Sequence, residues 1–189
     1  MRVVGIDPGF ATLGIVVLEL QPSSTRIIHH ENFTTRSVDA DGDRIDSISE
    51  RLLDVFEQYE PAAVGYESQA WTDIAARQQA MAQREQDDTT IGMNARSRRL
   101  HEVVGVIRCA ARCFELPVYE LMPSTVKVAV LGKGGGRAKK DAVKQRVRAI
   151  FGLGRCSEHV ADACAVALGT SVRHRHHVAT ATQHASLIH

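Results

Sequence analysis

The sequence begins MRVVGIDPG (residues 1–9), a short apolar run that ends in the carboxylate of Asp7 and a Pro-Gly stop. A second apolar run, Ile15 to Leu20, follows Gly14. This pattern predicts a strand, a tight turn and a hairpin partner. An unpartnered charge inside a protein is costly. Asp7 therefore needs ionic partners or a metal, and we expect the rest of the chain to supply them.

A second strand of the same design follows. AAVGYE (residues 62–67) is apolar and ends in Glu67. Before it, the mixed apolar and polar pattern of Thr25–Thr35 predicts an edge strand, and Asp43–Tyr59 has the apolar spacing of an amphipathic helix. A parallel neighbour reached through a crossover helix would bring Glu67 close to Asp7. That position is the carboxyl edge of the sheet, where α/β proteins place their sites.

The remaining chain completes an α/β pattern. We expect one more strand over Leu116–Leu121. We expect helices over Arg96–Glu115, Pro123–Val130, Lys139–Phe151 and Ser157–Val172. The predicted fold is a mixed five-stranded sheet with an antiparallel three-strand meander and flanking helices. The broad apolar face of the helix from Arg96 could also serve a dimer.

Acidic and basic residues are concentrated in different segments of the chain, although the net charge is only +1. Residues 39–60 are rich in acids, whereas Asp141 is the lone acid between Lys127 and Arg155. A polyanion would be attracted to the second stretch and repelled by the first. A solvated helix face is the plain alternative, but the adjoining Gly-rich loop favours phosphate contact. The candidate DNA-contacting side chains here are Lys133, Arg137, Lys139 and Lys144.

The last predicted helix carries two potential ligands. His159 and Asp162 are three residues apart and so share a face. With Asp7 and Glu67 they make four potential ligands for a hard metal. Oxygen-rich sites with one imidazole suit magnesium or manganese better than zinc. Two such ions, about 3.5–4 Å apart, activate water and stabilise the leaving oxygen in phosphodiester hydrolysis. The basic loops then indicate a nucleic-acid substrate.

The order of these motifs resembles the RuvC-type Holliday junction resolvases. The resemblance extends to Val172 and is carried by GIDPG (5–9), YE (66–67), LHEVVG (100–105), Val126-Lys127, Gly132, Lys140 and HVADA (159–163). It implies the RNase H-like fold, a homodimer, and paired nicking of two strands of like polarity in a four-way junction. It also implies Mg²⁺ or Mn²⁺, two per active site. A branch-migration complex is a further candidate partner.

By position, the resemblance assigns roles to individual residues. Asp7, Glu67 and Asp162 match catalytic acids, and His159 falls where the family has Asp or His. Two lysines, Lys127 and Lys140, fall on basic positions near the scissile phosphate, and we count Lys140 among the catalytic residues. Trp71 lies two residues from the place of an aromatic thought to stack on junction bases.

Other parts of the chain depart from the family pattern. Thr72–Met93 and Gly132–Arg137 look longer than usual, and residues 173–189 form a His-rich tail without a counterpart. We expect residues 1–172 to form the nuclease domain and 173–189 to be flexible. These departures leave open a broader nuclease for branched DNA, flaps or RNA/DNA hybrids, and a non-catalytic branched-DNA binding module. An ATP-binding protein of the actin and sugar-kinase class is disfavoured by the short chain.

Composition points to a cytoplasmic protein. No apolar stretch reaches membrane-spanning length, and the N-terminus lacks the apolar core of a signal peptide. We therefore expect a cytoplasmic location and no membrane partner. Cys109 and Cys113 lie one helical turn apart, and we expect them to be buried thiols.

Overall fold

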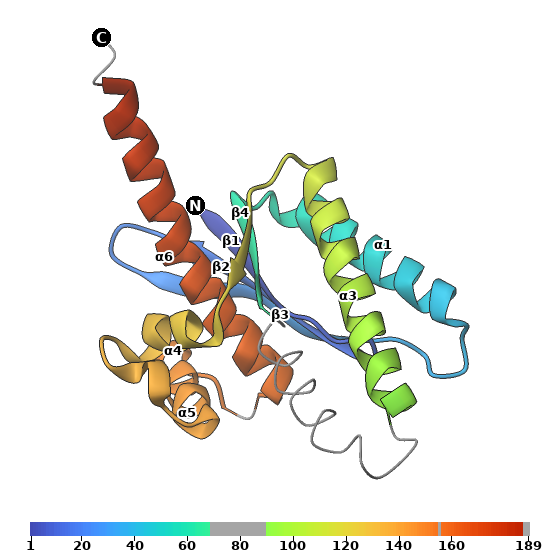
Figure 1. Cartoon of the computed structure of the whole chain (residues 1–189). Helices are drawn as coiled ribbons and strands as arrows, with labels where there is room; N and C mark the ends of the chain where they lie inside the picture. The colour runs from blue at the N-terminus through green and yellow to red at the C-terminus, as the bar shows by residue number, and fades with distance from the viewer. Residues whose placement is uncertain (69–89, 155, 187–189) are drawn as a thin grey trace.

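The computed structural model describes residues 1–68, 90–154 and 156–186 (Figure 1). Its centre is a five-stranded sheet in the order β3-β2-β1-β4-β5. The first three strands pair antiparallel, and β4 and β5 run parallel to β1. The predicted mixed sheet with a three-strand meander is therefore confirmed. The strands are β1 (Arg2–Asp7), β2 (Thr12–Leu20), β3 (Thr25–Thr34), β4 (Ala63–Glu67) and β5 (Val118–Leu121).

Helices cover both faces of the sheet (Figure 1). Alternation along β1 assigns its side chains to two cores: Val3 packs on one face, Val4 and Ile6 on the other. The first core includes residues of α4, α5 and α6, and the second includes residues of α1 and α3. The helices are α1 (Asp41–Tyr59), α3 (Thr90–Cys113), α4 (Pro123–Leu131), α5 (Lys140–Phe151) and α6 (Glu158–Ser186), with a short 3₁₀ turn η1 (Gly135–Arg137).

Two glycines let α6 lie directly on the sheet. Gly5 of β1 and Gly65 of β4 are paired neighbours in the parallel ladder. A Cβ atom on Gly5 would collide with the backbone of Ala163 and Ala167, and one on Gly65 would collide with Thr170. Small side chains on both partners therefore permit the close approach. This contact determines the position of the first turn of α6, which lies beside the carboxyl end of β1.

Some boundaries differ from those predicted. The final helix continues past Val172 to Ser186, where we expected a flexible tail. No Pro or Gly interrupts residues 173–186, and His174 is buried against Tyr119 of β5 with 3.1 Å between Nδ1 and the phenol oxygen. The division at residue 172 into domain and tail stays a prediction.

Two smaller expectations change as well. Helix α3 begins at Thr90, before the predicted start at Arg96. The prediction of buried thiols at Cys109 and Cys113 was wrong, because both are exposed. They lie off the side of α3 that packs on the sheet, where Val103, Ile107 and Ala111 are buried. In the described part of the chain, no helix is both long and apolar enough to cross a membrane.

Candidate active site

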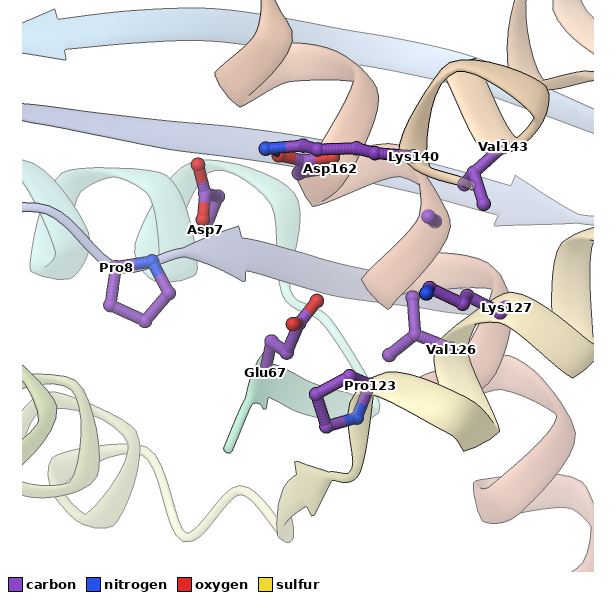
Figure 2. Close-up of a pocket in the computed structure, with 10 residues that line it drawn as sticks. Asp7, Pro8, Glu67, Pro123, Val126, Lys127, Lys140, Val143 and Asp162 are labelled. Atoms are coloured by element: carbon purple, nitrogen blue, oxygen red, sulfur yellow. Dashed lines mark ion pairs between the residues drawn. The ribbon is translucent and has the colours of Figure 1, made fainter. Parts of the chain in front are cut away.

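A cavity of about 350 Å³ opens where β1 and β4 end. Figure 2 shows three carboxylates around it, from Asp7 at the end of β1, Glu67 at the end of β4 and Asp162 in α6. Two lysines complete the polar lining, Lys127 from α4 and Lys140 from α5. Residues far apart in the sequence thus converge at one edge of the sheet.

Strand register explains why the first two acids meet. β1 and β4 pair in parallel up to Ile6 opposite Tyr66, so the next residue of each strand emerges at the same edge. Asp162 arrives from the other layer, because α6 crosses β1 and β4 on the glycine surface described above. The predicted convergence of Asp7 and Glu67 is therefore observed.

Two hydrogen bonds from basic side chains organise the carboxylates. His159 donates from Nδ1 to Asp7 Oδ2 at 2.6 Å, and Lys140 donates from Nζ to Asp162 Oδ2 at 2.7 Å. His159 reaches the site through Asp7 and is not among the side chains that line the cavity. Each of these pairs joins an acid to a base on a different element, which holds the acid in place.

Burial and mutual repulsion dominate the electrostatics. Burial raises the pKa of Asp7, against the opposing hydrogen bond from His159. Burial also raises the pKa of Glu67 to about 7, and the negative charges of Asp162 and Asp7 add to the effect. Lys140 and Lys127 act in the opposite direction on Glu67. The hydrogen bond to Asp162 raises the pKa of Lys140. A cluster of crowded, partly desolvated carboxylates favours a bound cation.

The donor set fits a hard divalent cation. Carboxylate oxygens with one imidazole are the ligands expected for Mg²⁺ or Mn²⁺. As they stand, however, no three acidic, histidine or cysteine side chains of the described residues are close enough to hold an ion. Lys140 and His159 instead occupy one oxygen each of Asp162 and Asp7. The four-ligand set of Asp7, Glu67, His159 and Asp162 therefore stays a prediction.

The predicted DNA-contacting residues lie on the elements beside the cavity. Lys133, Arg137 and Lys139 are exposed on the connection between α4 and α5. Lys144 is half-buried and lies 3.5 Å from Glu158. Figure 1 shows α4 and α5 packed next to the first turns of α6. Trp71 lies outside the described residues, so its stacking role stays a prediction.

Sequence reasoning missed a polar network behind Glu67. Ser68 donates from Oγ to Glu120 Oε1 at 2.6 Å, and Glu120 also accepts from Tyr66 and Arg108. These partners are separated by 12 to 54 residues along the chain. Only the polar character of Tyr66 and Glu120 within otherwise apolar strands could have signalled it.

Comparison with known proteins identifies the family. The family model described as "Crossover junction endodeoxyribonuclease RuvC" matches residues 3–170. The RuvC of Trichlorobacter lovleyi is 34% identical over 173 residues, which span 89% of this chain and 83% of that protein. The structure of Thermus thermophilus RuvC matches with a TM-score of 0.73 at 29% identity, covering 93% of this chain and 96% of that one.

A second structure of the T. thermophilus protein, "in complex with Holliday junction substrate", matches with a TM-score of 0.72 at 30% identity. It covers 89% of this chain and 92% of the T. thermophilus chain. The sequence resemblance therefore holds over nearly the whole length, and the sheet order and helical layers agree with the RNase H-like fold. The chain belongs to the RuvC family of crossover junction endodeoxyribonucleases.

Proposed function

We propose that this chain is a metal-dependent endonuclease that resolves four-way (Holliday) DNA junctions by paired phosphodiester hydrolysis in strands of like polarity. One observation carries the proposal: Asp7, Glu67 and Asp162 line a single cavity together with Lys127 and Lys140. Carboxylates beside lysines suit a phosphodiester, which needs both a cation site and positive charge. Family membership, and the Holliday junction substrate in the T. thermophilus RuvC complex, support the choice of DNA.

We assign the cation site to Asp7, Glu67, Asp162 and His159, and we propose two Mg²⁺ or Mn²⁺ ions. When bound, the ions would lower the pKa of a water and stabilise the leaving oxygen. Within the protein, His159 orients Asp7 through its 2.6 Å hydrogen bond. Ordering by neighbouring side chains is how proteins hold metal-ligating groups in a fixed direction.

The two cavity lysines act on the phosphate. Lys140 Nζ lies 2.7 Å from Asp162, so a phosphate bound beside Asp162 is within reach of this ammonium group. Lys127 faces the same cavity from α4. Positive charge at these points stabilises the negative charge that grows on the phosphate oxygens during hydrolysis. Lys140 is thus a catalytic residue in this scheme, and Lys127 binds DNA.

The DNA strand would continue from the cavity over the connection between α4 and α5. Its backbone would contact Lys133, Arg137, Lys139 and Lys144, which provide sequence-independent affinity. We further propose that Trp71 stacks on junction bases, that a homodimer carries two such sites for paired cuts, and that a branch-migration complex is a partner. Residues 1–172 would form the nuclease domain of a cytoplasmic protein.

A nicking assay tests the function. The substrates are a synthetic mobile four-way junction, linear duplex, a flap and an RNA/DNA hybrid, each with Mg²⁺ and then Mn²⁺. We expect symmetric paired nicks in the junction alone, abolished by Asp7→Asn. Comparable cutting of flaps or hybrids would instead indicate a broader nuclease. Binding to branched DNA without metal-dependent cutting would leave a binding module.

A further inference from the structure

A four-residue polar network ties both neighbours of Glu67 to β5 and α3. Tyr66 donates from its hydroxyl to Glu120 Oε2 at 3.2 Å, and Ser68 donates from Oγ to Glu120 Oε1 at 2.6 Å. Arg108 of α3 closes the network, donating to the Tyr66 hydroxyl at 2.7 Å and to Glu120 Oε2 at 2.8 Å. Both oxygens of Glu120 are thus used to hold the residues on either side of Glu67.

The network acts at a strand end that the sheet pairs on one side only. Glu67 is the last residue of β4, and the β1–β4 ladder ends one residue earlier, at Tyr66. On the other side, Glu67 pairs with Leu121 of β5, and the Ser68 amide donates to the Leu121 carbonyl at 2.8 Å. A strand end that is paired on one side only moves more easily than a strand interior. Additional side-chain bonds at this end therefore restrict the backbone that carries Glu67.

The chemistry of Tyr66 indicates more than packing. Tyr66 is 1% exposed, and Arg108 lies over its ring with Cζ 5.6 Å from the ring centroid. A phenylalanine would fill the same space without a hydroxyl to satisfy. The hydroxyl instead joins Arg108 and Glu120, whose side chains are 57% and 41% exposed. Such partly exposed pairs add little stability, so a geometric role accounts better for the network.

We infer that Tyr66, Glu120 and Arg108 are positioning residues that hold Glu67 in the orientation needed to bind a divalent cation. The inference rests on the proposed function of the cavity, since it gives Glu67 a metal to bind. Groups hydrogen-bonded directly to metal ligands typically change metal affinity by about 10–100-fold when removed. Because this network acts on Glu67 through the neighbouring residues Tyr66 and Ser68, we expect an effect at the lower end of that range. Positioning therefore predicts a change in metal binding that a general loss of stability would not produce.

The test measures Mn²⁺ binding directly, by electron paramagnetic resonance of free Mn²⁺ at pH 8.5. The variants are Tyr66→Phe and Arg108→Met, with Glu67→Gln as the reference for loss of a ligand. Arg112→Met is the matched control, because Arg112 is exposed one helical turn further along α3. We expect the Mn²⁺ affinity of both network variants to fall roughly 10-fold. The affinity of Arg112→Met should equal that of the parent protein. Junction nicking should recover at saturating Mn²⁺ in the network variants but not in Glu67→Gln.

Other outcomes separate the two proposals. Unchanged Mn²⁺ affinity in both network variants, with only a lower unfolding temperature, would overturn the positioning role. Absence of Mn²⁺ binding by the parent protein would overturn it as well. If the parent binds Mn²⁺ and cuts no junction, the proposed function fails. In that case a 10-fold affinity loss in the two network variants would still support positioning.

Discussion

Lys140 Nζ and Asp162 Oδ2 lie 2.7 Å apart, so the lysine of one helix neutralises a carboxylate of another inside the cavity. Lys140 also lowers the pKa of Glu67 through its charge. The same ammonium group would compete with a cation for Asp162 and would attract a phosphate. Its contributions to metal binding and to cleavage therefore have opposite signs.

Replacing Lys140 with glutamine should separate these contributions. We expect cleavage of the junction to fall roughly 100-fold, because one charge that stabilises the developing negative charge is lost. Mn²⁺ affinity at pH 8.5 should not fall, because Asp162 is released from its ion pair. Single-turnover cleavage and calorimetric titration measure the two effects. Arg112→Gln, which removes an exposed positive charge from α3 on the other face of the sheet, is the control and should leave the single-turnover rate nearly intact. Equal losses of metal affinity and rate in Lys140→Gln would contradict the assignment.

Glu67→Gln should stabilise the protein in EDTA at alkaline pH. The unfolded chain releases the proton of Glu67 near its ordinary pKa of 4.5, whereas the folded chain holds it to about 7. Stability therefore falls as pH rises between these values and stays reduced above pH 7. After allowance for partial solvent screening, we expect the unfolding temperature to rise by roughly 2–5 °C at pH 8.5. The difference should vanish near pH 4.5.

Thermal unfolding followed by circular dichroism at the two pH values tests this stabilisation. Glu57→Gln, on the exposed side of α1, serves as control and should change the unfolding temperature by less than about 1 °C at either pH. A Glu67→Gln variant that is less stable at pH 8.5 would show that burial and repulsion from Asp162 and Asp7 do not destabilise the Glu67 carboxylate in the folded protein.

Metal binding should release protons in a pH-dependent way. Below pH 7 Glu67 carries a proton that a bound cation must displace, since its pKa is about 7. Apparent Mn²⁺ affinity should therefore weaken as pH falls through 7, and more protons should be released per bound ion at pH 6 than at pH 8.5. Calorimetry in two buffers of different ionisation enthalpy measures the released protons. Equal release at both pH values would contradict the role of Glu67 as a ligand.

Much of this architecture follows from local sequence. The apolar runs ending in Asp7 and Glu67 predict two strands of one sheet. A helix between two such strands usually makes them parallel neighbours, so their acids meet at the same edge. The HVADA motif likewise places His159 and Asp162 on one turn of a helix. Both results depend on near neighbours in sequence, together with one general rule of topology.

The rest depends on distances that no local pattern encodes. That Lys140 contacts Asp162 rather than solvent, and that Arg108 reaches Tyr66, is decided by how α5 and α3 dock on the sheet. The helical state of residues 173–186 was missed because His-rich polar composition suggests a loose tail. Contact of His174 and His177 with Tyr119 supplies the packing that composition could not reveal.

Gly5→Ala should be strongly destabilising. Its new methyl group would collide with the backbone of Ala163 and Ala167, and the backbone of a packed helix cannot move aside cheaply. We expect a loss of roughly 3 kcal/mol or more in the free energy of unfolding, with displacement of Asp162 from the cavity. Gly42→Ala is the control, since Gly42 lies in the first turn of α1 with open space around its Cα. Urea denaturation should show Gly42→Ala unchanged or slightly stabilised, and an equally mild Gly5→Ala would refute the close contact.

The salt dependence of junction binding should show that DNA phosphates contact the basic connection between α4 and α5. Each phosphate contact contributes about 0.9 to the slope of log affinity against log salt concentration, because a bound counterion is released. Arg137→Gln and Lys139→Gln should therefore each make the slope less negative by about 0.9. Arg112→Gln removes the same charge from α3, on the opposite face of the sheet, and should leave the slope unchanged. Fluorescence anisotropy with the catalytically inactive Asp7→Asn background, in Ca²⁺ over a range of KCl concentrations, gives the slopes. An equal change of slope in all three variants would mean that net charge alone governs binding. An unchanged slope in Arg137→Gln and Lys139→Gln would mean that the DNA does not pass over this connection.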